Sequence, residues 1–146
     1  MTTTWILVAN ASTAALYANR GPHKGLELVK QFQHVESRER TGEMITDRPG
    51  HYQTDGGAHG AYSQTTDPKQ HEEDKFATEL AHELETGRTG NHYARLILVA
   101  SNPFMGKLNK QLNMHVRSLT TDTVEKDYTH LAERDLASHL ENILYV

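Results

Sequence analysis

Two short, uninterrupted apolar runs constrain the fold of this chain more than any other feature. Residues 5–9 are WILVA and residues 95–100 are RLILVA, and each run ends at small polar residues. Continuous apolar strands are typical of the centre of a sheet that is covered on both faces. The two runs therefore predict two central strands, each buried on both sides.

Two further segments near the N-terminus predict neighbouring strands. Residues 14–18, AALYA, follow the first run after a gap of turn length and end at a loop rich in Asn, Gly and Pro. In the next segment Leu26, Leu28 and Phe32 fall on one face of an alternating pattern, which predicts a half-buried strand. The first three strands therefore predict a meander.

Residues 67–87 carry helix signals at both ends. Asp67 as N-cap, Pro68 at the first helical position and Gln70 at the third resemble a capping box, and Gly87 is expected to end the helix. The apolar stripe of this helix is predicted to be Phe76, Ala77, Leu80, Ala81 and Leu84.

Three more elements are predicted after the second central strand. A helix is expected with Asn102 as its cap and Pro103 at its first position, followed by a strand over residues 115–120. The chain then ends in a helix with Ala132, Leu136, Leu140 and Ile143 along one side. The order βββαβαβα predicts an α/β fold with a mixed five-stranded sheet, as in the ribonuclease H-like superfold.

The chain length fits a single domain over residues 1–146, interrupted by a long flexible loop at about residues 37–67. Loops of this length inside compact domains are usually functional or disordered. The glycines would allow close backbone approach to a phosphate or ribose, whereas the alternative is a polar loop without a function of its own. The candidate functional residues are Arg48, Pro49, Gly50, His51, Gly56, Gly57 and His59.

Composition excludes several classes of protein. The chain has no cysteine, so it can build neither disulfides nor a thiolate zinc site. The net charge of −4 argues against binding a nucleic-acid backbone over the whole surface, although a local basic face remains open. No apolar run approaches the ~20 residues of a membrane span, and the N-terminus matches a secretory signal poorly. We therefore expect a cytoplasmic protein.

Metal chemistry is also not expected. A ribonuclease H-type nuclease needs carboxylates at the ends of the central strands, where this chain has Asn10, Ser101 and Asn102. Glu79 and His82 have the Glu-x-x-His spacing of di-iron bundles, but such sites need two pairs, and a solvated helix face explains the single pair better. The sequence predicts no metal and no cofactor, and it favours a protein that is not an enzyme.

Several segments resemble one family over almost the whole chain. The most specific are Asp47-Arg48-Pro49-Gly50, Phe104-Met105-Gly106-Lys107-Leu108 and Lys126-Asp127, and they occur in the order and spacing of bacterial host attachment proteins, described as required for attachment to host cells. That family is in turn similar to the middle domain of archaeal and eukaryotic class 1 release factors. The resemblance implies the same fold as the order of elements.

The release factors carry a Gly-Gly-Gln motif on the corresponding loop, which helps water to cleave peptidyl-tRNA. Here Ala58 follows Gly56 and Gly57, where the glutamine would stand. The resemblance implies a ribosome- or tRNA-associated factor that uses its Gly/Arg/His-rich loop. Two alternatives stay open, an interaction protein that contributes to attachment through a protein partner and a hydrolase of the peptidyl-tRNA ester. Candidate RNA or phosphate contacts are Arg38, Arg40, Lys107, Lys110 and Lys126.

Overall fold

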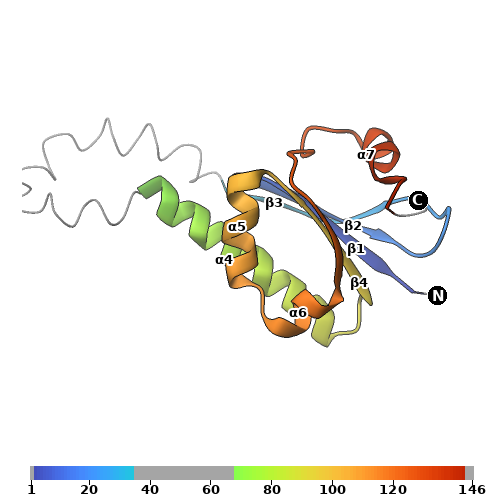
Figure 1. The fold of residues 1–146 in the computed structure, drawn as a ribbon, viewed down its shortest axis with the longest axis horizontal. Coiled ribbons are helices and arrows are strands. Elements are labelled where there is room, and N and C mark those ends of the chain that lie inside the picture. The colour runs from blue at the N-terminus through green and yellow to red at the C-terminus, as the bar shows by residue number, and fades with distance from the viewer. Residues whose placement is uncertain (1, 35–67, 144–146) are drawn as a thin grey trace, which may run out of the picture.

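The computed structural model describes residues 2–34 and 68–143. In this part of the chain a mixed five-stranded sheet has the order β3-β2-β1-β4-β5, with helices on both faces (Figure 1). The strands are β1 Thr4–Ala9, β2 Thr13–Asn19, β3 Glu27–Gln33, β4 Arg95–Ala100 and β5 Thr120–Val124. The helices are α4 Pro68–Thr89, α5 Asn102–Gln111, α6 Met114–Leu119 and α7 Glu133–Leu140. The predicted α/β class and mixed sheet are confirmed.

Strand β1 lies at the centre of the sheet. It pairs with β2 in the antiparallel sense and with β4 in the parallel sense, so that Trp5 lies between Ala18 and Leu96. All six residues of β1 are buried, as are the five residues of β4 that follow Arg95. The apolar runs that predicted two central strands are therefore confirmed, and the first three strands form the expected meander.

The two faces of the sheet carry different helices. Helices α4, α5 and α6 pack on one face, where Phe76, Leu80 and Phe104 meet the side chains that β1 and β4 direct toward them. Helix α7 packs on the other face and contributes Leu136 and Leu140 to a smaller cluster. We call these the α4 face and the α7 face.

The prediction that Leu26, Leu28 and Phe32 share one face of edge strand β3 is wrong. Leu26 packs in the cluster of the α7 face, Phe32 packs in that of the α4 face, and Leu28 is 45% exposed, so the three side chains do not share a buried face. The pairing with β2 shifts at Val29, because Leu16 pairs with Lys30 whereas the next residue of β2 pairs with Leu28. One extra residue reverses the alternation along a strand. The bulge therefore separates Leu26 from Phe32.

Gly87 does not end the first helix, contrary to prediction. Helix α4 continues to Thr89, and Gly87 is buried inside it. A Cβ atom at this position would lie 2.3 Å from Cη2 of Trp5, so the glycine allows the indole ring to pack against the helix. The predicted apolar stripe of the helix is buried as expected. The predicted cap Asp67 lies outside the described residues.

The predicted cap of the next helix is also wrong. Helix α5 begins at Asn102 itself, and the cap position is taken by Ser101, whose side chain makes no capping hydrogen bond. The Asn102 amide instead donates to Glu125 beyond β5. Pro103 is therefore the second helical residue and not the first, but it stays in the first turn, where a missing backbone N–H has no consequence.

Residues 115–119 form most of helix α6 and not the predicted strand, of which only Thr120 lies in a strand. Asn113 caps this helix, because its side chain accepts a hydrogen bond of 2.8 Å from the backbone N–H of Val116. Val116 is buried and Leu119, three residues later, packs beside it, which is a helical spacing. Strand β5 follows directly at Thr120. The order of the described elements is therefore βββαβααβα.

The C-terminal helix is shorter than its apolar pattern predicted. Helix α7 begins at Glu133 with Ala132 at the cap position, and a turn closed by Leu131 N–H and the Tyr128 carbonyl precedes it. The predicted apolar side is otherwise confirmed, because Leu136 and Leu140 are buried. No helix in residues 2–34 and 68–143 is both long and apolar enough to cross a membrane.

Candidate functional site

A compact hydrogen-bond cluster lies where β1 ends. The side-chain oxygen of Asn10 accepts hydrogen bonds from the backbone N–H groups of Ser12 and Thr13, at 2.8 and 2.9 Å. Its amide nitrogen donates to Asp127 Oδ2 at 3.0 Å and to Thr129 Oγ1 at 3.1 Å. One side chain thus fixes the β1–β2 turn and also joins it to the connection between β5 and α7. We call Asn10, Asp127 and Thr129 the clasp.

Asp127 is held in its charged form by the same cluster. Its Oδ1 atom accepts from the backbone N–H of Thr129 at 3.0 Å and from the Thr129 hydroxyl at 2.6 Å. Partial burial alone would raise the pKa of Asp127, but the hydrogen bonds from Thr129 and Asn10 outweigh burial and lower this pKa. The carboxylate is therefore a weak base, and both of its oxygens are engaged.

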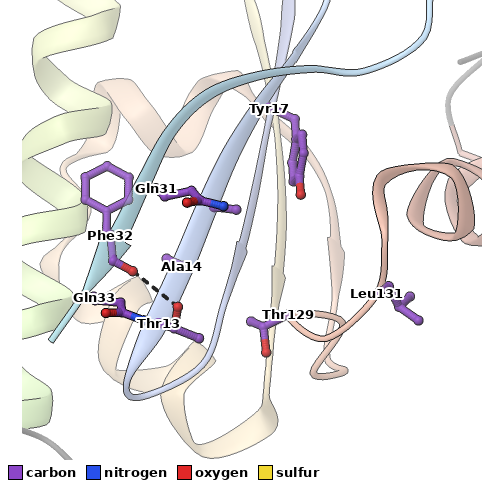
Figure 2. A pocket seen from close by; sticks show the side chains of 9 residues that line it. Thr13, Ala14, Tyr17, Gln31, Phe32, Gln33, Thr129 and Leu131 are labelled. Carbon is purple, nitrogen blue, oxygen red and sulfur yellow. Dashed lines mark hydrogen bonds between the residues drawn. The ribbon is translucent and has the colours of Figure 1, made fainter. Parts of the chain in front are cut away.

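A groove of about 500 Å³ lies beside the clasp on the α7 face, between the β2–β3 pair and residues 129–131. Figure 2 shows Tyr17, Gln31, Thr129 and Leu131 around this space. The residues that line it are Thr13, Ala14, Ala15, Tyr17, Gln31, Phe32, Gln33, Thr129 and Leu131. None of these described lining residues carries a charge.

The lining residues differ in whether their polar atoms are already engaged. The Thr13 hydroxyl donates to the Phe32 carbonyl at 3.2 Å (Figure 2), and the Thr129 hydroxyl belongs to the clasp. The exposed amides of Gln31 and Gln33 are hydrogen-bonded to none of the described residues. The groove thus combines a fixed hydroxyl side with two free carboxamides.

Tyr17 supplies the aromatic surface of the groove. Its side chain is half-buried and packs against the smaller cluster of the α7 face. Burial raises the pKa of Tyr17, and the nearby carboxylate of Glu133 raises it further. The phenol therefore stays neutral and presents a ring and a hydroxyl toward the groove (Figure 2).

The positions where a nuclease would hold metal ions are occupied by amide and hydroxyl groups. Asn10 lies in the clasp, Ser101 precedes α5, and Asn102 pairs with Glu125. Within residues 2–34 and 68–143, no group of three His, Asp or Glu side chains is arranged to hold a metal ion. Glu79 and His82 are both exposed on α4, as a solvated helix face requires.

The predicted phosphate contacts within the described residues do not come together. Lys107 donates to Gln70 and, at 3.1 Å, to Asp74, so it joins α5 to α4. Lys110 lies in the last turn of α5, which returns the chain toward the amino ends of the parallel strands, whereas Lys126 follows the carboxyl end of β5. Both are exposed, at opposite ends of the sheet.

The remaining predicted site residues lie outside the described residues. They are Arg38, Arg40, Arg48, Pro49, Gly50, His51, Gly56, Gly57 and His59. Their assignment to a functional loop stays a prediction.

Sequence analysis missed the groove and a contact between His34 and the buried Glu72. Alternation along β2 and β3 could have placed Tyr17 and Gln31 on the same face of the sheet, but the bulge at Val29 obscures the register of the two strands. At the end of β3, His34 Nε2 lies 2.8 Å from Oε1 of Glu72, which is only 5% exposed. The His34 ring also stacks on Phe76, 5.4 Å between centroids, which fixes the end of β3 on α4.

The comparison with protein families decides which family this fold represents. A family model described as "Protein required for attachment to host cells" matches residues 5–140. The chain belongs to this attachment family. The match extends from β1 to the end of α7, so it includes the clasp and the residues that line the groove. No curated protein matches the chain.

Membership of the attachment family confirms the resemblance carried by residues 104–108 and 126–127. These segments now have structural roles. Phe104, Met105 and Leu108 are buried between α5 and the sheet, and Asp127 belongs to the clasp. The matched range therefore includes elements that build the fold as well as elements that border the groove in this chain.

Proposed function

We propose that this member of the attachment family is a binding protein and that it contributes to attachment by holding a partner in the groove beside the clasp. The observation that carries the proposal is that the groove has a hydroxyl group held in place on one side and exposed carboxamides on the other. The clasp immobilises Thr129, whereas the exposed amides of Gln31 and Gln33 bond to no residue in the described part of the chain. A preorganised side lowers the entropic cost of binding.

The clasp supports binding more than catalysis. The Thr129 hydroxyl donates to a carboxylate, which is the arrangement of a nucleophile and its base. However, the pKa of Asp127 is lowered and both of its oxygens accept other hydrogen bonds, so this carboxylate is a poor acceptor for the threonine proton. The same contacts are well suited to keeping residues 127–129 in one conformation.

The proposal is tested by an attachment assay with cells that lack the gene. Deletion should lower the number of cells that adhere to host cells, and the wild-type gene should restore it. A gene with Gln31→Ala and Gln33→Ala should fail to restore adhesion, whereas Gln111→Ala, an exposed glutamine at the end of α5, should restore it fully. Normal adhesion of the deletion strain would contradict the proposal.

We propose, as a second candidate, a cytoplasmic ribosome- or tRNA-associated role. It is supported by the strand order, which is compatible with the ribonuclease H-like and release-factor middle-domain folds. Such a protein should sediment with ribosomes at low salt and be released at high salt. Absence from the ribosome pellet at low salt would exclude this role. A peptidyl-tRNA hydrolase would in addition lose activity when Gly56, Gly57 or His59 is replaced by alanine.

A further inference from the structure

We infer that the groove beside the clasp binds a neutral saccharide. This inference rests on the proposed function, because it names the chemical class of the partner that the groove would hold. The volume of the groove, about 500 Å³, lies within the range of roughly 300–1,000 Å³ that is usual for small-ligand sites.

The chemistry of the lining favours a ligand rich in hydroxyl groups. A carboxamide offers two N–H donors and a carbonyl acceptor, so it can bind a hydroxyl in either role. Gln31 and Gln33 present two such amides from the same strand, and alternate residues of a strand point to the same face. Each hydroxyl on a sugar ring can likewise donate and accept, so two neighbouring hydroxyls match this pair of amides.

Tyr17 completes the site with an apolar surface. The faces of aromatic rings attract weakly positive C–H groups, and the apolar face of a sugar ring presents such groups. Tyr17 lies on the same sheet face as the glutamines, and Leu131 borders the groove from residues 129–131, so a sugar ring in the groove would meet amides as well as apolar atoms (Figure 2).

Charge around the groove argues against an acidic ligand. Glu133 is close enough to raise the pKa of Tyr17, and Asp127 contacts Thr129 at the rim. Two carboxylates near a site without a lining cation would repel phosphate, sulfate or sialic acid groups. The ligand class is therefore a neutral sugar and not an acidic one.

A peptide strand is a poorer match to this groove. The groove lies on the face of the β2–β3 pair, where the backbone groups that join the two strands are already paired from Thr13 with Gln33 to Ala18 with Glu27. Addition of a peptide strand needs free backbone groups at an edge. Recognition in the groove must therefore use side chains.

Saturation-transfer NMR with the full chain would test the inference. The probes are neutral methyl glycosides of galactose, mannose and N-acetylglucosamine, with sialyllactose and a sulfated galactoside as acidic comparisons and glucosamine as a cationic one. Transfer to at least one neutral glycoside is expected, with little to the charged sugars. No transfer to any neutral sugar, or stronger transfer to a charged one, would overturn the inference.

Variants connect the binding to the groove. Gln31→Ala with Gln33→Ala should raise the dissociation constant at least about tenfold, because both carboxamides that would bind the sugar hydroxyls are lost. Gln111→Ala should leave it unchanged. Tyr17→Leu should also lose affinity, and Tyr17→Phe should keep most of it because the ring remains. Unchanged affinity in the folded double glutamine variant would overturn the inference.

Failure of this inference can be separated from failure of the proposed function. A deletion strain that adheres poorly, together with purified protein that binds none of the neutral sugars, would reject only the saccharide. A deletion strain that adheres normally would reject the proposed function whatever the protein binds.

Discussion

The two faces of the sheet differ in how they are covered. On the α4 face, the 22-residue helix α4 lies beside α5 and α6, and the aromatic rings of Trp5, Phe76 and Phe104 pack among them. On the α7 face, an eight-residue helix contributes two buried leucines, and much of the β2–β3 pair borders the groove. The α4 face therefore carries the main core, and the α7 face leaves sheet surface accessible for recognition.

The two faces therefore differ in how much they contribute to the stability of the fold. Hydrophobic stabilisation grows with the apolar area that is buried, so the α4 face contributes most of the free energy of folding. The α7 face has less apolar burial and relies on the clasp to hold residues 127–129. Regions with few buried contacts open at lower free energy than the core. We expect the α7 face to open without unfolding of the α4 face.

The largest effect is expected from Leu80→Ala on the α4 face. Leu80 is completely buried in α4 against the sheet. Its truncation should lower the free energy of unfolding by about 4 kcal/mol, because a cavity remains in a region that several elements hold rigid. Urea denaturation measures the loss. A loss of less than about 1 kcal/mol would show that the α4 face is not the main core.

Leu136→Ala on the α7 face should cost less. Leu136 is also fully buried, but α7 is short and can shift into the space or detach. We expect a loss of about 2 kcal/mol together with faster amide hydrogen exchange in α7, while exchange in α4 stays slow. Hydrogen exchange with mass spectrometry distinguishes the two regions. Equal acceleration in both helices would show that the faces unfold as one unit.

The comparison of faces also shows which parts of the fold the sequence could predict. Strands β1 and β4 were predictable because continuous burial requires uninterrupted apolar residues, and α4 because its stripe repeats over several turns. Both belong to the well-covered centre and to the α4 face. Their sequence patterns directly reflect the burial that stabilises them.

The failed predictions concern features that depend on distant residues. The packing role of Gly87 requires Trp5, which lies far away in the sequence, and the face of Leu26 depends on a bulge at Val29. Helix α6 was missed because a segment of six residues gives less than two turns of periodicity, which a strand pattern also fits.

The candidate site was harder to predict than the fold. The sequence drew attention to Asn10 and Asp127 separately, but only the chain topology brings them within 3.0 Å of each other. The groove uses Gln31 and Gln33, whose residue type carries no chemical motif. Sites built from ordinary polar residues are recognisable only from their arrangement in space.

Gly87→Ala should produce an intermediate loss on the α4 face. The new methyl group would overlap the Trp5 ring, so either the indole or the helix must move, at a cost of about 2 kcal/mol. Gly106→Ala in α5 is the matched control, because no atom lies within 4 Å of its added Cβ, and it should raise the free energy of unfolding by about 0.5–1 kcal/mol. Stabilisation by both substitutions would disprove the packing role of Gly87.

The smallest effect should be the acid dependence that Asp127 gives to the α7 face. The pKa of Asp127 is lowered in the folded chain, so its charged form stabilises the clasp at every pH above the unfolded pKa of about 3.9. This contribution is lost as the pH falls through the folded pKa. Asp127→Asn should therefore unfold at a lower temperature than the wild type at neutral pH, and the difference should shrink below about pH 4.

A control is needed because the pKa of a second carboxylate, Glu85 near the other end of the sheet, is also lowered in the folded chain. Hydrogen bonds from Arg88 and Asn113 lower the pKa of Glu85 to about 2, so this group also loses its contribution in acid. Glu85→Gln should change the acid unfolding of the whole chain but leave exchange in α7 at neutral pH unchanged, whereas Asp127→Asn should accelerate that exchange. If Asp127→Asn leaves exchange in residues 127–140 unchanged, the clasp does not hold the α7 face, and the groove must be positioned by the packing of Leu136 and Leu140 alone.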